Sequence, residues 1–339
     1  MPIQDAAMMR AGVAVSTLVL GLSLPSVVLA QDATDDRVAT PATSTTPAAD
    51  KPAEPAKPHD DADDRWRATL DAVFGFGATP VLSQKIIGPL VTQESRTAET
   101  VRYATTSLNL GLSNEIMNDF RVGVLLPVGF GSVFSSATRG STVVGNVTLG
   151  GVLQRRTSND VTLSGGLDVA LPTASGEQLP DAATIPTLGH VDQKQLDRFS
   201  LLHAMSDSRG REDTAAFTSN HLGLVPKLGA AWTASEKVDL DGYVKYQSLH
   251  ATSDNAVYEG SVVVAVRGSY HLSKTVDGTL RVWTNLAVAG PDSPVAAVEP
   301  QLSARLGWVT PMVGVVLPVA GELTSPYNVG VRAVLAARF

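Results

Sequence analysis

The chain has 339 residues, of which 44% are hydrophobic and 17% charged, and its formal net charge is −7 at pH 7. Cysteine is absent, which excludes disulfides, zinc–thiolate sites and cysteine nucleophiles. Part of the negative charge comes from acidic residues near the N-terminus, so the charge gives no reason to expect a nucleic-acid partner.

The first thirty residues have the pattern of an export signal. Arg10 precedes the apolar run AGVAVSTLVLGLSLP, and Val28 and Ala30 occupy the small-residue positions before QDA. We therefore predict that residues 1–30 are a cleavable signal peptide and that the mature chain lies outside the cytoplasm. A retained membrane anchor is the alternative, but Pro25 and the polar sequence that follows argue against it.

Residues 31–64 form a separate segment with five prolines and no aromatic residue. Such a segment buries too little apolar surface to offset the entropy of ordering, so we predict a disordered linker. Its acidic run from His59 to Asp64 could bind a divalent cation weakly, but nothing rigid fixes the ligands. We read it as a solvated charge run and predict no metal site.

From Trp66 onward, apolar residues alternate with small or polar ones. In VTLSGGLDVALP (161–172), Val161, Leu163 and Leu167 share one face, and Thr162 and Asp168 share the other. This period of two predicts strands with one apolar and one polar side. Twelve such segments are expected: 67–78, 101–113, 120–133, 143–155, 161–172, 221–234, 238–250, 258–272, 278–290, 297–309, 311–320 and 327–339.

The connections between these segments alternate between short and long. The short ones include NEIMND, RTSND, the SEK turn, KTVDG and a tight turn at Thr310-Pro311, and the longest covers 173–220. No stretch after residue 64 has eighteen consecutive apolar residues, so no spanning helix is expected. We predict an all-β fold over residues 65–339, a single transmembrane antiparallel β-barrel of about 12 strands. A soluble β-sandwich is the alternative.

Aromatic residues on the apolar faces support the barrel. Near the short turns these are Trp66, Phe120, Trp232, Tyr270, Trp308 and Phe339, and near the long loops Phe76, Phe130 and Tyr327. Two aromatic girdles around a Val/Leu band are typical of a barrel in a bilayer. We therefore expect outer-membrane lipids to surround residues 65–339.

Two segments resemble those of known families. The last strand, VGVRAVLAARF, resembles the C-terminal signal of bacterial outer-membrane proteins. That resemblance implies recognition of Phe339 by the barrel-assembly machinery. The segment ALPTASGE (170–177) resembles an element of a family of outer-membrane transporters linked to the phenol meta-cleavage pathway, although Ala174 stands where that family has glycine.

Motifs for catalysis are missing: there is no G-x-S-x-G, H-E-x-x-H or Walker loop. We predict no enzyme activity and no cofactor. An outer-membrane lipid hydrolase would need a Ser-His pair on the lipid-facing wall, whereas we expect His250 and His271 to face the lumen. Gly75 and Gly77 are expected to mark barrel curvature or close packing in the lumen.

The long connection 173–220 contains an expected helix. Leu196, Phe199, Leu202 and Met205 recur at helical spacing. The helix either enters the barrel mouth as a constriction or packs on the rim, or the loop is mobile. The spacing alone leaves these alternatives open.

The polar faces of the strands supply the candidate lumen residues. They are Arg121, Lys227, Lys245, Arg267, Arg281, Arg305, Arg332, Arg338, Asp71, Asp168, Asp241 and Glu259, with Asp239 and Glu299 on the same faces. Several of the arginines fall on neighbouring strands, which predicts a wall that is basic on one side and favours anions. Alternatively, the arginines are paired with carboxylates and brace a filled barrel.

These patterns together predict a bacterial outer-membrane channel or transporter for small solutes, with a polar, partly basic lumen. The alternatives are a non-conducting structural or adhesion barrel and, third, an outer-membrane lipid hydrolase.

Overall fold

The computed structural model describes residues 65–84, 96–134, 139–158, 160–174, 193–253, 257–290, 293–324 and 328–339. The predicted signal peptide, the predicted linker and Tyr327 lie outside the described residues.

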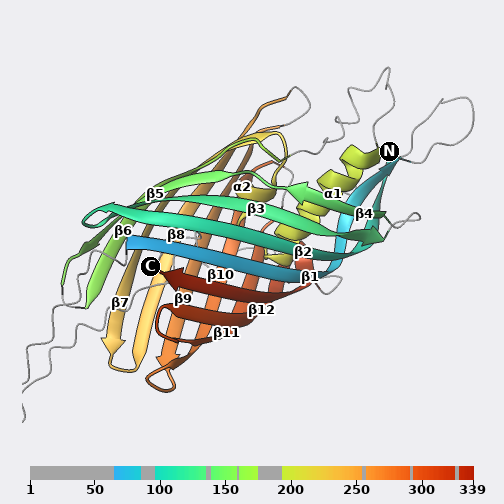
Figure 1. The fold of residues 1–339 in the computed structure, drawn as a ribbon. Coiled ribbons are helices and arrows are strands. Elements are labelled where there is room, and N and C mark those ends of the chain that lie inside the picture. The colour runs from blue at the N-terminus through green and yellow to red at the C-terminus, as the bar shows by residue number, and fades with distance from the viewer. Residues whose placement is uncertain are drawn as a thin grey trace, which may run out of the picture.

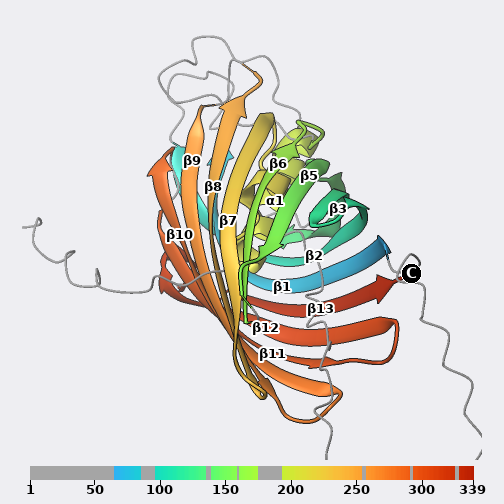
Figure 2. The same cartoon turned by 90° about the vertical axis from the view of Figure 1, so that its left-hand side faces the viewer.

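The described residues form a closed antiparallel barrel (Figures 1 and 2). Its strands are β1 (Trp66–Gln84), β2 (Arg96–Met117), β3 (Phe120–Phe134), β4 (Arg139–Val144), β5 (Thr148–Arg156), β6 (Val161–Ala170), β7 (His221–Ser235), β8 (Val238–Ala251), β9 (Glu259–His271), β10 (Val276–Ala289), β11 (Val295–Ala304), β12 (Val309–Gly321) and β13 (Val329–Arg338). Each strand pairs with its neighbour in the chain, and β1 pairs with β13 to close the wall. β4 and β5 both pair with β3, as two parts of one wall strand, so the predicted twelve-stranded barrel is confirmed.

The predicted alternation sets the two faces of the wall. On β7, Leu224 and Leu228 are exposed on the outer face, whereas Val225 and Lys227 are buried on the lumenal face. The aromatic side chains expected outside are exposed by 45–68% at Trp66, Trp232, Tyr270, Trp308 and Phe339, and Phe76 and Phe130 are exposed at the opposite end. Phe120 is half-buried. The outer surface is therefore apolar with aromatic borders, as a lipid-facing wall requires.

Both ends of the barrel domain meet at one end of the barrel. The backbone N–H of Phe339 donates to the carbonyl of Trp66 at 3.0 Å, and the N–H of Trp66 donates to the carbonyl of Phe339 at 3.0 Å. The connections 118–119, 157–160, 236–237, 272–275 and 305–308 lie at this end, which we call the short-turn end. Strands β1, β3, β6, β8, β10 and β12 end at the other end of the barrel, which we call the long-loop end.

Two predicted boundaries are wrong. The turn between β11 and β12 lies at 305–308, where Gly307 has φ +64°, and not at Thr310-Pro311. Pro311 lies within β12 opposite Leu335. The segment 143–155, predicted as one strand, is interrupted at 145–147.

Two helices lie between β6 and β7: α1 (Gln193–Ser208) and α2 (Thr214–Phe217). A short 3-10 helix, η3 (Glu322–Thr324), follows β12. Among the described residues, no helix is long and apolar enough to span a membrane.

Candidate functional site

The segment between β6 and β7 fills part of the lumen. It consists of α1, the turn 209–213 and α2, and we call residues 193–217 the plug (Figure 1). α1 lies against β1, β2, β3 and β4, and α2 lies against β7 and β8. From Ser200 to Phe217, every residue except His203 is buried. Of the alternatives left open by the sequence, the structure therefore shows a helix inside the barrel.

Glycines on the lumenal face make room for α1. Gly75 on β1 and Gly330 on β13 approach Ser208 so closely that a β-carbon at either position would collide with it. Gly129 on β3 approaches Met205 in the same way. Because only glycine lacks a β-carbon, these positions encode the close approach of helix and wall. The predicted close lumenal packing at Gly75 is confirmed, and at Gly77 a β-carbon would meet the amide of Asn328 instead.

Apolar side chains hold the helices of the plug together. Leu201, Leu202 and Met205 of α1 form a buried cluster with Val143 of β4 and Phe217 of α2. Burial of these side chains is the ordinary source of stability for a short amphipathic helix. α1 is therefore a packed element of the barrel interior.

The interruption between β4 and β5 anchors α2. The Asn146 side-chain amide donates to the carbonyls of Ala215, at 2.9 Å, and Thr218, at 2.7 Å. The Thr173 hydroxyl donates to the carbonyl of Gly145 at 2.8 Å. The described part of ALPTASGE thus holds the strand interruption, and Asn146 joins that interruption to α2 and Thr218.

The turn 209–213 attaches to the wall through buried ion pairs. Nη1 of Arg209 lies 2.7 Å from Oδ2 of Asp71 on β1, and its Nε donates to the Ser107 hydroxyl on β2 at 2.9 Å. Asp213 accepts a hydrogen bond of 3.1 Å from Lys245 on β8. Buried charges are tolerated only when paired in this way.

Glu212 lies at the centre of the turn's contacts. Arg281 donates to Oε2 through Nη1 at 2.8 Å, and both Nη2 of Arg281 and the Tyr243 hydroxyl donate to Oε1. Arg332 lies 3.9 Å from the same carboxylate. Burial alone would raise the pKa of Glu212, but Arg281, Lys245 and Arg332 outweigh it and lower that pKa below its ordinary value. We call Glu212, Tyr243, Arg281 and Arg332 the Glu212 cluster.

The backbone of the turn is also fixed by the wall. Trp283 on β10 donates its indole N–H to the carbonyl of Gly210 at 3.0 Å, and the Asn285 amide donates to the carbonyl of Arg211 at 2.6 Å. Gly210 has φ +63°, and a β-carbon there would lie 2.7 Å from the Trp283 ring. Arg211 also has a positive φ, of 53°, which costs a non-glycine residue about 1–2 kcal/mol. The wall contacts therefore hold the turn in a conformation that the chain does not favour on its own.

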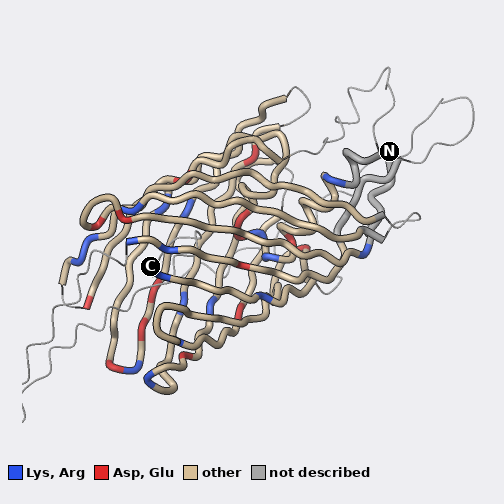
Figure 3. The backbone as a smooth tube through the Cα atoms, in the orientation of Figure 1, with Lys and Arg blue, Asp and Glu red and all other residues tan. Residues whose placement is uncertain are grey.

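The predicted lumen residues on the strands face the lumen, and most of them form ion pairs. Arg121 pairs with Glu115, Lys227 with Asp168, Lys245 with Asp213, Arg267 with Asp241, Arg281 with Glu212, Arg305 with Asp277, and Arg332 with Asp71. Arg338 and Glu259 lie half-buried on the lumenal faces of their strands. Arg305 lies in the turn after β11 and not on a strand. Figure 3 shows basic and acidic positions interspersed over the barrel.

The predicted anion preference required a wall of unpaired basic side chains. Because these side chains are paired with carboxylates, the closed barrel has no such wall within its described residues. Glu299 lies 3.3 Å from Arg332 and 3.5 Å from Arg281, so carboxylates lie within the supposed basic side. The sequence could show which residues share a face, but it could not show which of them lie opposite one another. The structure shows the alternative arrangement, in which the arginines face carboxylates.

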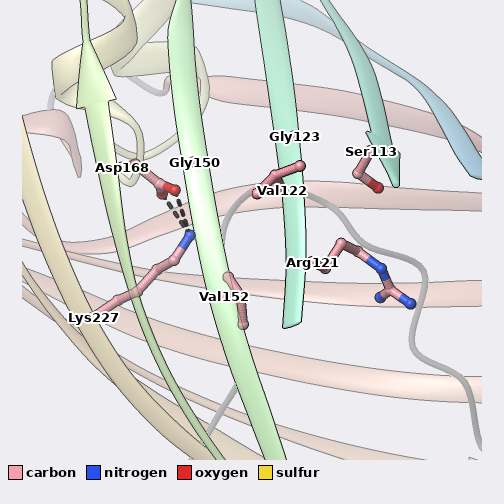
Figure 4. Close-up of a pocket in the computed structure, with 8 residues that line it drawn as sticks. All are labelled: Ser113, Arg121, Val122, Gly123, Gly150, Val152, Asp168 and Lys227. Atoms are coloured by element: carbon pink, nitrogen blue, oxygen red, sulfur yellow. Dashed lines mark hydrogen bonds and ion pairs between the residues drawn. The ribbon is translucent and has the colours of Figure 1, made fainter. Parts of the chain in front are cut away.

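A small pocket lies in the lumenal wall away from the plug (Figure 4). Its lining residues come from β2, β3, β5, β6 and β7: Ser113, Arg121, Val122, Gly123, Gly150, Val152, Asp168 and Lys227. The Lys227 amine lies 2.6 Å from both oxygens of Asp168, whereas the Arg121 side chain extends away from this pair. No plug residue lines the pocket, so the polar lining of the lumen continues beyond the plug.

The prediction for His250 is wrong, because this side chain lies exposed on the outer face. Its Nε2 lies 3.0 Å from the Ser248 hydroxyl, and its ring lies beside Tyr258. Within the described residues, no polar group contacts the other ring nitrogen of His250, whereas a nucleophilic serine needs an oriented base. His271 faces the lumen as predicted, between Asp239 and Asp277.

Arg209, Glu212 and Asp213 of the plug are lumen residues that the sequence analysis did not predict. They lie in the charged run DSRGRED, directly after the helical spacing of α1. The sequence feature that could have indicated these residues is a dense charge run at the end of an amphipathic helix in a long insertion. Such charges need partners once the helix is buried.

Comparisons with known proteins give structural similarity only. Neither a scan against family models nor a search of curated proteins finds a match. An outer-membrane channel from Pseudomonas putida F1 has a TM-score of 0.48 at 11% identity, over 83% of this chain and 99% of that one. The NanC porin has a TM-score of 0.44 at 9% identity, over 80% of this chain and 100% of that one. The translocator domain of the autotransporter NalP from Neisseria meningitidis has a TM-score of 0.44 at 11% identity, over 83% of this chain and 90% of that one. At this level of similarity, nothing about solute or mechanism follows.

Proposed function

We propose that the protein is an outer-membrane channel for small solutes, closed at rest by the plug and opened when the turn 209–213 leaves the wall. The observation that carries this proposal is the way the lumen is filled. Its centre is occupied by a loop segment attached through ion pairs, which can exchange partners, and the wall side chains alone do not fill it.

The wall does not depend on the plug for closure. β1 pairs with β13 along ten residues, and the other neighbouring strands are hydrogen-bonded to one another. Withdrawal of the plug separates its buried ion pairs and the apolar contacts of α1, but it breaks none of the hydrogen bonds between strands, so the wall stays closed.

The cellular setting belongs to the same proposal. The signal-like residues 1–30, the aromatic borders and the terminal Phe339 support export and insertion by the barrel-assembly machinery into the outer membrane of a bacterium. Membership of the transporter family linked to phenol meta-cleavage rests on the segment 170–177 alone.

A non-conducting structural barrel is the second candidate. The observation in its favour is that the lumenal cations named above face carboxylates, as they would in a barrel braced from inside. The two functions differ in whether the lumen conducts once the plug is removed.

Two variants test the channel in planar bilayers. Replacing residues 193–217 by a short Gly-Ser linker should produce a steady ion current. In a second variant, Ala215→Cys with Gly223→Cys, the two β-carbons would lie about 3.3 Å apart, slightly below the usual disulfide range. Because the native chain has no cysteine, only this pair can form, and oxidation should abolish the openings of the resting channel until a reductant is added.

Gly223→Cys alone is the matched control, and the oxidant should leave its current unchanged. The channel function is wrong if the plug-deleted protein inserts as a heat-modifiable barrel and carries no current. That result would support the structural barrel.

A further inference from the structure

We propose that the Glu212 cluster is a carboxylate-binding site of the barrel wall, that Glu212 occupies it as an internal ligand, and that a small aromatic carboxylate competes for it. This inference rests on the proposed channel function and names the class of solute that it would take.

The wall side of the cluster is built to hold a carboxylate. Arg281 grips both oxygens of Glu212 through its two terminal nitrogens, and the Tyr243 hydroxyl adds a third hydrogen bond. A planar guanidinium bound to both oxygens is the strongest and most specific way for a protein to recognise this group. Tyr243 is 3% exposed with the plug in place, so this donor is desolvated while Glu212 occupies the site.

Aromatic rings flank the site. The Arg281 guanidinium carbon lies 5.1 Å from the Trp283 ring and 5.8 Å from the Tyr243 ring. At present the plug covers the indole, because its N–H donates to Gly210 and the backbone of Gly210 lies against the ring. When the plug withdraws, an indole surface and a free N–H lie directly beside a carboxylate clamp. A solute with an aromatic ring and one carboxylate matches both features.

The charge balance after withdrawal also favours an anion. In the closed state, Arg281 and Arg332 face Glu212, Glu299 and Asp71, and Lys245 faces Asp213. Departure of the plug removes Glu212 and Asp213 as well as Arg209. The wall then keeps three cations against two carboxylates, and Arg281 loses its bidentate partner. An incoming carboxylate restores the balance.

The affinity for a free carboxylate depends on its competition with the tethered carboxylate of Glu212. Glu212 is held on the same chain, so its effective concentration at the site is on the order of 1 mM or higher. A free solute therefore binds the wild-type protein weakly, and binding should strengthen when the internal carboxylate is neutralised.

The first experiment measures benzoate binding to the full-length protein by calorimetry, with benzyl alcohol as the uncharged analogue. Glu212→Gln should strengthen benzoate binding by about tenfold or more and leave benzyl alcohol binding unchanged. Adding Arg281→Gln should abolish the gain. Asp213→Asn is the matched control, because it loosens the neighbouring attachment to Lys245 without vacating the Arg281 site.

A second experiment needs no change in the cluster. Ser206 is buried in α1 and its hydroxyl has no hydrogen-bond partner within the described residues, so Ser206→Cys introduces a thiol at little structural cost. A water-soluble thiol reagent should label this cysteine slowly. Benzoate should accelerate the labelling, and benzyl alcohol should not. This measurement decides the matter if Glu212→Gln fails to fold.

The inference is overturned if Asp213→Asn strengthens benzoate binding as much as Glu212→Gln does, or if both probes accelerate labelling equally. Either result would mean that the plug merely loosens. Neither measurement uses ion current, so failure of the channel function would appear separately, as a plug-deleted barrel that does not conduct.

Discussion

Arg332 on β13 binds Asp71 on β1 through two parallel hydrogen bonds of 2.9 Å, across the seam where the two ends of the barrel domain close the wall. Asp71 also accepts the hydrogen bond from Arg209 of the plug. One carboxylate therefore joins the seam of the barrel to the segment that fills it.

Replacing Asp71 by Asn should destabilise the barrel by up to about 3–5 kcal/mol, because two buried guanidinium groups lose their nearest carboxylate. The measurement is unfolding of the refolded protein in denaturant, followed by heat-modifiable migration. Asp160→Asn, in an exposed turn at the short-turn end, is the control and should be neutral. Equal stability of both variants would contradict a structural role for Asp71.

Deletion of Phe339 should block assembly in cells and leave export intact. The terminal residue exchanges two backbone hydrogen bonds with Trp66, and its side chain belongs to the outer aromatic border. Heat-modifiable migration of the membrane fraction reports assembly. Phe339→Tyr keeps the ring and both hydrogen bonds and should assemble normally. Normal assembly of the deleted form would show that the terminal ring is dispensable.

Most of the wall could be predicted from the sequence because burial on one side of a strand produces a period of two. The predicted strand boundaries were wrong where a residue is compatible with both a turn and a strand. Pro311 suggested a turn, yet proline fits within β12, and Gly307 marks the real turn. The interruption at 145–147 left no break in the alternation, because it depends on contacts of Asn146 with a distant loop.

For the site, the sequence could predict only which residues face the lumen. Alternation placed Arg267, Arg281 and Arg332 in the lumen, but their partners come from other strands and from the plug. The pairing depends on the register between strands and on how the long connection folds. The alternation of residues along one strand predicts neither of these. Glu212 was missed for that reason.

Leu228, which has the largest exposed fraction among the large apolar side chains described for the wall, should tolerate arginine poorly. It is 72% exposed near the middle of β7, and an arginine at the bilayer midplane costs about 2–4 kcal/mol in this class of barrel. Leu306 is the matched control, since it is 60% exposed in the turn at 305–308, where the cost of Leu306→Arg should be about 0–1 kcal/mol. Stability in lipid vesicles is the readout. Equal losses of stability in both variants would mean that Leu228 does not lie deeper in the bilayer than Leu306.

Mild acid should not open the plug. A carboxyl group whose pKa is lowered by its partners contributes attachment above its ordinary pKa, and this contribution is lost only as the pH falls through the lowered value. The pKa of Glu212 is lowered from 4.5, so the group stays charged and bound between pH 7 and pH 5. Ion current in planar bilayers should therefore be the same at both values. A larger current at pH 5 would mean that another group controls the plug.

Ion selectivity should depend on the pairing of charges in the lumen. Nε of Arg267 lies 2.6 Å from Oδ2 of Asp241, so the two side chains form a neutral unit on neighbouring strands. Arg267→Gln alone leaves Asp241 uncompensated and should shift the reversal potential in a salt gradient toward cation selectivity. Arg267→Gln with Asp241→Asn restores neutrality and should return the potential to its original value. Both are measured in the protein whose residues 193–217 are replaced by the Gly-Ser linker, so that the plug does not limit the current. A double variant that shifts as far as the single one would show that Arg267 acts as an unpaired cation, as the sequence first suggested.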